Sequence, residues 1–160
     1  MLGRTHSGPV AVPAASKVVY WDGSRIVDND LAGISAPTAF SIYQDKLALA
    51  ISAANELRIR STSGWTTFTL AGFICSAYGN SMLEVGTYLY IASGTNLIHR
   101  FDGAAITLVR TVAGCDTANG WGVTSLALYQ GLLHFGWNTA AALTRVGRHD
   151  PESTAANEWV

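Results

Sequence analysis

The chain contains few charged residues. Of its 160 residues 13% are charged and 49% are hydrophobic, and the formal net charge is −1, whereas soluble domains carry about 25% charged residues. The lysines and arginines are scattered, so the sequence lacks the basic patch that nucleic acids and anionic membranes require. With so few charges to solvate a surface, we expect extensive burial or contact with other protein subunits.

Cysteines and long apolar runs are also scarce. Cys75 and Cys115 are the two cysteines, 40 residues apart, which is too few for a disulfide framework. We expect two separate buried thiols that act as small hydrophobes, and pairing between neighbouring repeats stays open. No apolar run reaches the about 20 residues of a membrane-spanning helix. Residues 1–16 lack the apolar region of a signal peptide and are expected to form an N-terminal arm or leader.

The sequence does contain an internal repeat. Similar strand-like segments surround Leu47, Leu89 and Leu133, at steps of 42 and 44 residues. Arginines occupy the matching place on the strand that precedes the next turn, at steps of 40 and 45 residues: Arg60, Arg100 and Arg145. A period in the low forties, built from strand-like segments, predicts the blades of a β-propeller.

Short turns divide each repeat into strands. Asp22-Gly23 and Asp102-Gly103, 80 residues or two periods apart, predict structural hairpin turns, because both central residues of a type I′ turn need positive φ. The strand segments are apolar on both faces, which is typical of sheets packed between neighbours. We therefore predict an all-β chain of about three and a half to four antiparallel, four-stranded blades. They comprise a part-blade at 17–33, blades at 34–72 and 73–114, and an incomplete blade at 115–160.

Such a half-ring would leave strand edges and sheet faces unpaired. The N-terminal strands could complete the C-terminal blade, several chains could assemble one ring, or this chain could be part of a longer propeller. An apparent strand reaches the last residues, Trp159-Val160, which favours one of the last two arrangements.

Motifs for catalysis and metal binding are missing from the sequence. Residues 28–30 begin like a calcium-binding loop, but Ala32 and Ala39 stand where that loop needs an oxygen ligand and an acidic residue. The sequence has no Gly-x-Ser-x-Gly nucleophile motif. Glu84 is the one acid on an expected innermost strand, whereas glycoside hydrolysis needs two carboxylates. We therefore expect that the protein is not an enzyme and that it binds no cofactor or metal. The alternative is that the chain is a fragment of an extracellular propeller enzyme.

Aromatic and polar loop residues are the candidates for binding. Trp65 and Trp121 fall at or near expected loops, where exposed rings could stack on sugars or anchor a protein partner. Residues 114–122 form the longest polar loop, which places Asp116 and Asn119 near Trp121. Trp65, Trp121, Asp116 and Asn119 are therefore predicted as binding residues. The alternative is that the tryptophans fill gaps between blades.

The second repeat carries a family resemblance. Residues 87–103, TYLYIASGTNLIHRFDG, resemble the kelch-like and related blades found in extracellular bacterial proteins and in phage tail and virion proteins. The resemblance covers nearly the whole chain beyond residue 16. It implies propeller architecture and, by association, a structural protein of a phage tail or virion that acts through subunit assembly and host-surface contact. The alternatives are a lectin-like module that binds surface glycans and an extracellular location.

Overall fold

The computed structural model describes residues 17–21, 26–32, 37–51, 55–69, 81–92, 94–117, 122–139 and 143–151. The chain divides into two compact units, Met1–Ala36 and Pro37–Val160. In the first unit, β1 (Lys17–Trp21) and β2 (Ile26–Ala32) form an antiparallel hairpin within the predicted part-blade. The predicted turn residues Asp22 and Gly23 and the predicted arm at 1–16 lie outside the described residues.

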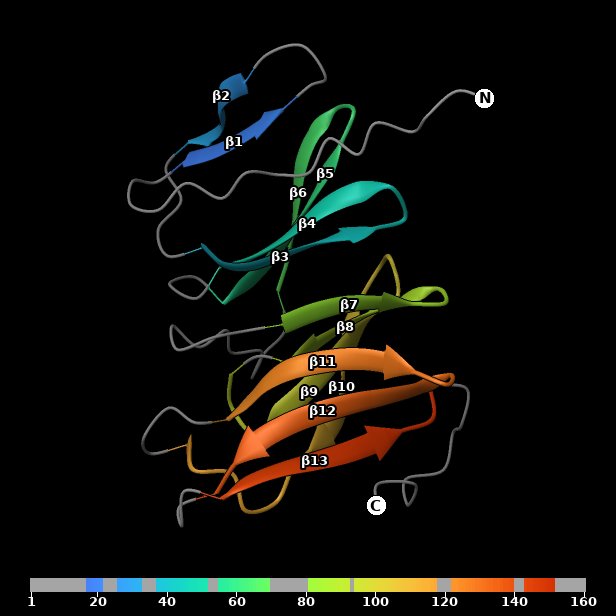
Figure 1. Ribbon diagram of the computed structural model, residues 1–160. Helices are drawn as coiled ribbons and strands as arrows, with labels where there is room; N and C mark the ends of the chain where they lie inside the picture. The colour runs from blue at the N-terminus through green and yellow to red at the C-terminus, as the bar shows by residue number, and fades with distance from the viewer. Residues whose placement is uncertain are drawn as a thin grey trace. The chain divides into compact units, whose positions relative to one another are not determined.

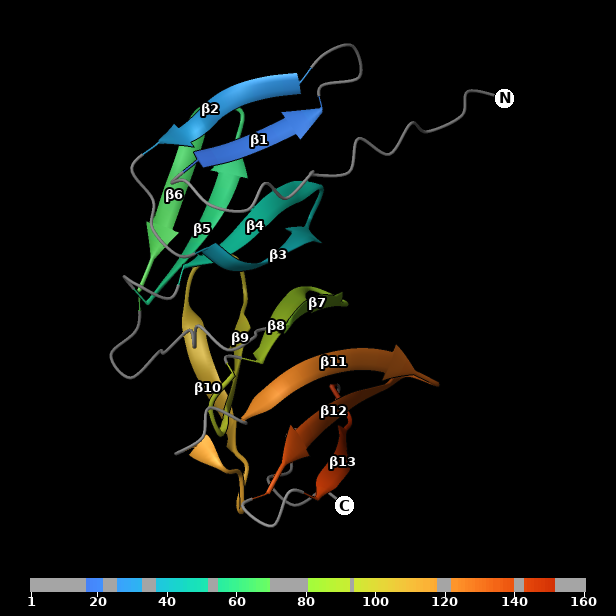
Figure 2. The same cartoon turned by 60° about the vertical axis from the view of Figure 1, so that its left-hand side comes forward.

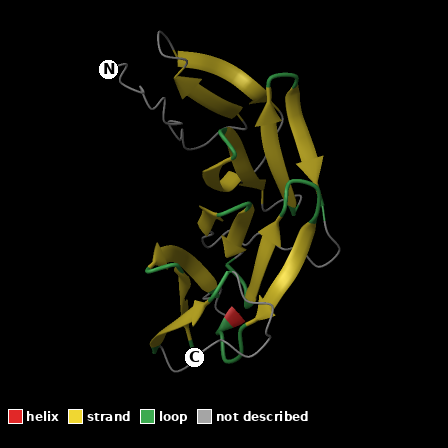
Figure 3. Ribbon diagram, turned by 90° about the vertical axis from the view of Figure 1, so that its right-hand side faces the viewer, coloured by secondary structure: helices red, strands yellow, loops and turns green. Residues whose placement is uncertain are grey.

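The second unit contains three antiparallel sheets in which each strand pairs with the next along the chain (Figure 1). The first has the order β3 (Pro37–Tyr43), β4 (Lys46–Ile51), β5 (Glu56–Ser61), β6 (Gly64–Phe68). The second consists of β7 (Ser81–Val85), β8 (Tyr88–Ala92), β9 (Leu97–Phe101) and β10 (Ile106–Thr111). The third consists of β11 (Val123–Tyr129), β12 (Leu132–Asn138) and β13 (Thr144–His149). Within the described residues, strands make up almost all of the regular structure (Figure 3), which confirms the predicted all-β, propeller-type fold.

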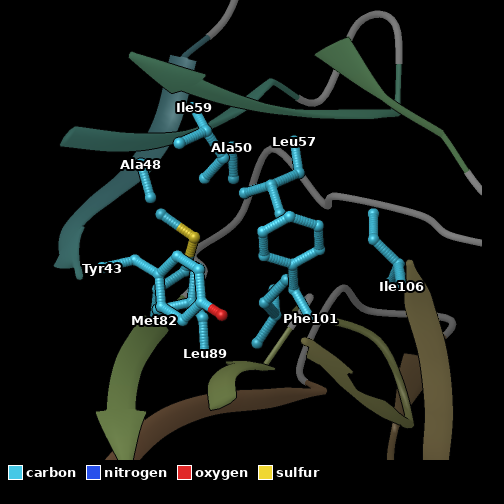
Figure 4. Close-up of a cluster of buried hydrophobic side chains, with 10 residues drawn as sticks. Tyr43, Ala48, Ala50, Leu57, Ile59, Met82, Leu89, Phe101 and Ile106 are labelled. Carbon is cyan, nitrogen blue, oxygen red and sulfur yellow. The ribbon is translucent and has the colours of Figure 1, made fainter. Parts of the chain in front are cut away.

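The three sheets of the second unit pack face to face, with their first strands β3, β7 and β11 side by side (Figures 1 and 2). Alternate residues of β8 point to opposite faces. Leu89 and Ile91 pack among buried side chains of the β3–β6 sheet (Figure 4), whereas Tyr90 packs with Leu133 and Phe135 of the β11–β13 sheet. The middle sheet is therefore apolar on both faces, as the strand pattern predicts.

Tight turns join the first two strands of each sheet of the second unit. Gln44 and Asp45 have φ of 48° and 60°, and Gln130 and Gly131 have φ of 51° and 78°, as a type I′ turn requires. Gly86, at φ 61°, begins the matching turn between β7 and β8, where glycine at the first central position is typical of a type II′ turn. Primed turns match the twist of the flanking strands, which explains why each pair forms a regular hairpin.

The connection between β9 and β10 differs from the predicted two-residue turn. Phe101 pairs with Ile106, so four residues form the connection, and in the Asp102-Gly103 pair only Gly103 has positive φ. The Asp102 carboxylate instead accepts the backbone N–H groups of residues 104 and 105, at 2.8 and 2.7 Å. These hydrogen bonds lower the pKa of Asp102. The aspartate therefore acts as a local side-chain cap of the loop.

The strand register also corrects the predicted arginine repeat. Ala48, Tyr90 and His134 occupy one position of the repeat, and their partners on the next strand are Ile59, Arg100 and Arg148. The predicted equivalence of Arg60 and Arg145 with Arg100 is therefore wrong. The connecting segments differ in length between repeats, so residue spacing does not preserve cross-strand position.

Candidate binding pocket

A pocket of about 190 Å³ lies between the β3–β6 sheet and the connection that follows β9. It forms at the end of the sheets where the β3–β4 turn and the β9–β10 loop lie. One side is the face of the β3–β6 sheet that carries Ile59 and Thr66, which are paired across β5 and β6. The opposite side is made by Phe101 and Gly103.

Small side chains leave this space open. Deeper between the two sheets, large residues such as Leu57, Leu89 and Phe101 fill the interior (Figure 4). Towards the turns, the β3–β6 sheet presents Ser61 and Thr66 on the same face, and the facing loop presents Gly103. A hydroxymethyl group, a threonine and a glycine cannot fill the volume that the leucines occupy deeper in the core, and a hollow results.

Three aromatic rings form the floor of the pocket. The rings of Phe68 and Phe101 have centroids 4.6 Å apart, and the Tyr43 ring meets Phe101 edge-on at 5.4 Å. Tyr43 and Phe101 are buried and Phe68 is half-buried, so the packing of the core holds the rings in place. Phe68 is therefore the ring that presents an apolar surface to the pocket, and the two buried rings hold it in position.

Polar side chains surround the mouth. Gln44, Lys46 and Thr66 are exposed, and Ser61 is half-buried. The Ser61 hydroxyl donates to the Gly64 carbonyl at 3.1 Å, and the Gln44 amide nitrogen donates to the Tyr43 hydroxyl at 3.2 Å. The mouth therefore combines hydroxyl, amide and ammonium groups above an aromatic floor.

Two hydrogen bonds fasten the β3–β4 turn to the neighbouring sheet. The Tyr43 hydroxyl donates to the Thr87 carbonyl at 2.8 Å, and the Gln44 backbone N–H donates to the Glu84 carboxylate at 3.0 Å. Burial raises the pKa of Tyr43, and the negative charges of Asp102 and Glu84 add to the rise. The tyrosine therefore stays a neutral hydrogen-bond donor at physiological pH. These bonds fix the turn that supplies one wall of the pocket.

A second notable surface is the outward face of the β11–β13 sheet, the face opposite to the buried Leu133 and Phe135. Register places ten residues on it: Ser125, Ala127, Tyr129, Leu132, His134, Gly136, Asn138, Thr144, Val146 and Arg148. Tyr129 is 63% exposed and Val146 is 67% exposed. The equivalent face of the β7–β10 sheet, which carries Tyr88 and Tyr90, is covered by the β11–β13 sheet. The outward face is therefore more exposed than its counterpart in the preceding repeat.

The structure describes two of the four binding residues predicted from sequence, and neither of them lines the pocket. Trp65 lies half-buried on β6, paired with Arg60 and on the opposite face from the pocket. Asp116 is 6% exposed, and its backbone N–H donates to the Asn138 carbonyl at 3.0 Å. Asn119 and Trp121 lie outside the described residues.

Of the two separate thiols predicted from sequence, the structure describes one. Cys75 lies outside the described residues, and Cys115 is a half-buried free thiol. Burial raises the pKa of Cys115 to about 11. The thiol is therefore protonated and unreactive at neutral pH.

Within the described residues, no group of three or more histidine, cysteine, aspartate or glutamate side chains is placed to hold a metal ion. In that part of the chain, no helix has the length and apolarity needed to cross a membrane.

Comparisons with known proteins add little to this picture. No known family model matches the chain, and no curated protein matches it. Among solved structures, the chain is similar to the crystal structure of BamB from Moraxella catarrhalis, at 13% sequence identity and a TM-score of 0.36. The match covers 92% of this chain and 58% of the BamB chain, so this chain spans little more than half of that length. A likeness this distant carries no argument about function, and the fold assignment rests on the sheets themselves.

Proposed function

We propose that this chain is an interaction and assembly protein, and that the outward face of its β11–β13 sheet receives a second copy of the chain. The exposed apolar surface at Tyr129 and Val146 is the observation that carries this proposal. In the preceding repeat, the equivalent face is covered by another sheet of this same chain. The outward face of the β11–β13 sheet is exposed, and a sheet of the same type from a second copy of the chain is the partner that fits it.

Composition supports the same role. Charged residues make up 13% of the chain, and a surface with so few charges is suited to subunit contacts. The face also carries Arg148 and His134 among its apolar residues. A mixture of aromatic, aliphatic and arginine side chains is typical of protein interfaces.

The test is the solution mass of the purified chain and of face variants, measured by light scattering. We expect a discrete oligomer that Val146→Glu and Tyr129→Glu convert to monomer, because a buried, unpaired carboxylate opposes association. Leu108→Glu is the matched control, since Leu108 is 51% exposed on a different sheet. A wild-type monomer, or an oligomer that both face variants leave intact, contradicts the proposal.

The setting that we propose is a virion, with a tail-associated position and contact with a host surface. Support comes from the resemblance of residues 87–103 to blades of phage tail and virion proteins. Mass spectrometry of purified virions tests this setting, and finding the chain instead in the secreted fraction favours the extracellular alternative.

The proposed role involves binding and not catalysis. Glu84, the acid expected on an innermost strand, accepts the Gln44 backbone N–H and so has a structural role at the turn. A hydrolase activity of the chain that Glu84→Gln abolishes without unfolding it would support the propeller-enzyme alternative instead.

A further inference from the structure

We propose that the pocket between the β3–β6 sheet and the β9–β10 loop binds one pyranose ring of a neutral glycan. The inference stands on the pocket alone and does not depend on the assembly role. The cavity of about 190 Å³ is smaller than the about 300–1,000 Å³ of pockets that enclose drug-sized ligands. It therefore accommodates a single ring, with the remainder of a glycan extending into solvent.

The aromatic floor matches one face of a sugar ring. A pyranose presents its axial C–H groups on an apolar face, and such a face packs on aromatic rings. Phe68 is the half-buried member of the aromatic group, in contact with Phe101 at a centroid distance of 4.6 Å. Because the core already fixes these rings, binding costs little side-chain entropy.

The mouth matches the hydroxyl groups of the same ring. Sugar hydroxyls donate and accept, so they need partners of both kinds. Thr66 carries a hydroxyl that can do either, and the Ser61 hydroxyl, which already donates to the Gly64 carbonyl, can accept. The Gln44 side-chain carbonyl accepts, and the Lys46 ammonium donates. These polar groups lie at the rim, above the apolar floor. A sugar ring has one apolar face and a polar edge, so the floor can contact the face while the rim binds the edge.

The charges around the mouth argue for a neutral ligand. Lys46 is the one charged residue that lines the pocket. Asp45 adjoins it in the turn, and Asp102 adjoins Gly103 across the opening. A phosphate or carboxylate would therefore meet a single cation in the pocket lining, with two acids at neighbouring positions of the chain, whereas phosphate-binding sites gather several positive groups or backbone N–H groups.

The experiment begins with a glycan array and then titrates the full chain with methyl pyranosides of the neutral hexoses that the array identifies. Binding is followed by NMR through the ring resonances of Tyr43, Phe68 and Phe101. We expect these resonances to shift and a ligand to bind at millimolar concentration. Thr66→Phe places a bulky ring at the mouth from an exposed strand position, so it should weaken binding at least tenfold.

Three variants separate this site from the tryptophans and from general unfolding. Thr107→Phe is the matched control, because Thr107 is exposed on β10 and does not line the pocket. Trp65→Ala and Trp121→Ala report on the binding residues predicted from sequence. Binding that Thr66→Phe weakens and the other three leave unchanged supports the pocket. Failure to bind any glycan overturns the proposal, and so does binding that survives Thr66→Phe and is lost in a tryptophan variant.

Discussion

His99 should make the stability of this protein fall steeply between pH 7 and pH 5. The residue lies in the middle of β9, opposite Ile91 on β8, and its side chain is 1% exposed. Burial lowers the pKa of His99 from 6.5 to about 4, because the apolar interior disfavours the charged imidazolium. In the unfolded chain the same imidazole binds a proton near pH 6.5.

The sign of the pH dependence of the free energy of unfolding follows from proton linkage. Between pH 6.5 and pH 4 the unfolded state binds more protons at His99 than the folded state does, so the free energy of unfolding falls as pH falls. The full difference of about 2.5 pKa units corresponds to roughly 3 kcal/mol, and about 2 kcal/mol of this is lost by pH 5. Since whole domains are stable by only about 5–15 kcal/mol, this loss is a large fraction of the total.

Urea denaturation at pH 7 and pH 5, for the wild type and His99→Leu, measures the effect. Leucine cannot be protonated, so the variant should lose about 2 kcal/mol less between the two pH values than the wild type. His134→Leu is the matched control, because His134 is only half-buried on β12. If His99→Leu shows the same pH dependence as the wild type, the argument from burial is refuted.

Two further outcomes are expected. Gly147→Ala should destabilise the second unit by about 1–3 kcal/mol, because a Cβ atom at position 147 would overlap the ring of Phe135 directly opposite on β12; thermal unfolding measures this, and a melting temperature equal to that of the wild type would show that the ring can move aside. Cys115 should react with iodoacetamide far more slowly at pH 8 than free cysteine does, and faster as pH approaches its pKa of about 11; mass spectrometry of the alkylated peptide follows the rate, and reaction as fast as that of free cysteine would mean that the thiol is not held in an apolar setting.

The architecture was predictable because it depends on two patterns visible in the sequence, the spacing of the repeats and the apolar residues of the strands. The spacing of Leu47, Leu89 and Leu133 is a property of the chain alone, and these residues do occupy one position in successive sheets. Apolar residues on both faces of β8 likewise indicate a sheet with two neighbours.

The pocket was not predictable, because it depends on which small residues meet in space. Ser61, Thr66 and Gly103 come from two sheets, and nothing in their local sequence distinguishes them from ordinary turn and strand residues. The register of β5 against β6 and the approach of the β9–β10 loop bring them together. The arginine repeat failed for a related reason, since equal spacing along the chain does not guarantee equal position across a pair of strands.

The joint between the β7–β10 and β11–β13 sheets has a consequence for how such repeats diverge. The Gly94 N–H donates to the Val123 carbonyl at 2.9 Å, and the Val123 N–H donates to the Thr95 carbonyl at 2.6 Å. Because these hydrogen bonds join main-chain groups, most of the neighbouring side chains can differ between repeats without breaking them. Gly122 is the exception, because a Cβ atom there would overlap the backbone of Thr95. Among repeats that share this connection, the position of Gly122 is therefore expected to remain glycine, while the side chains around it can change.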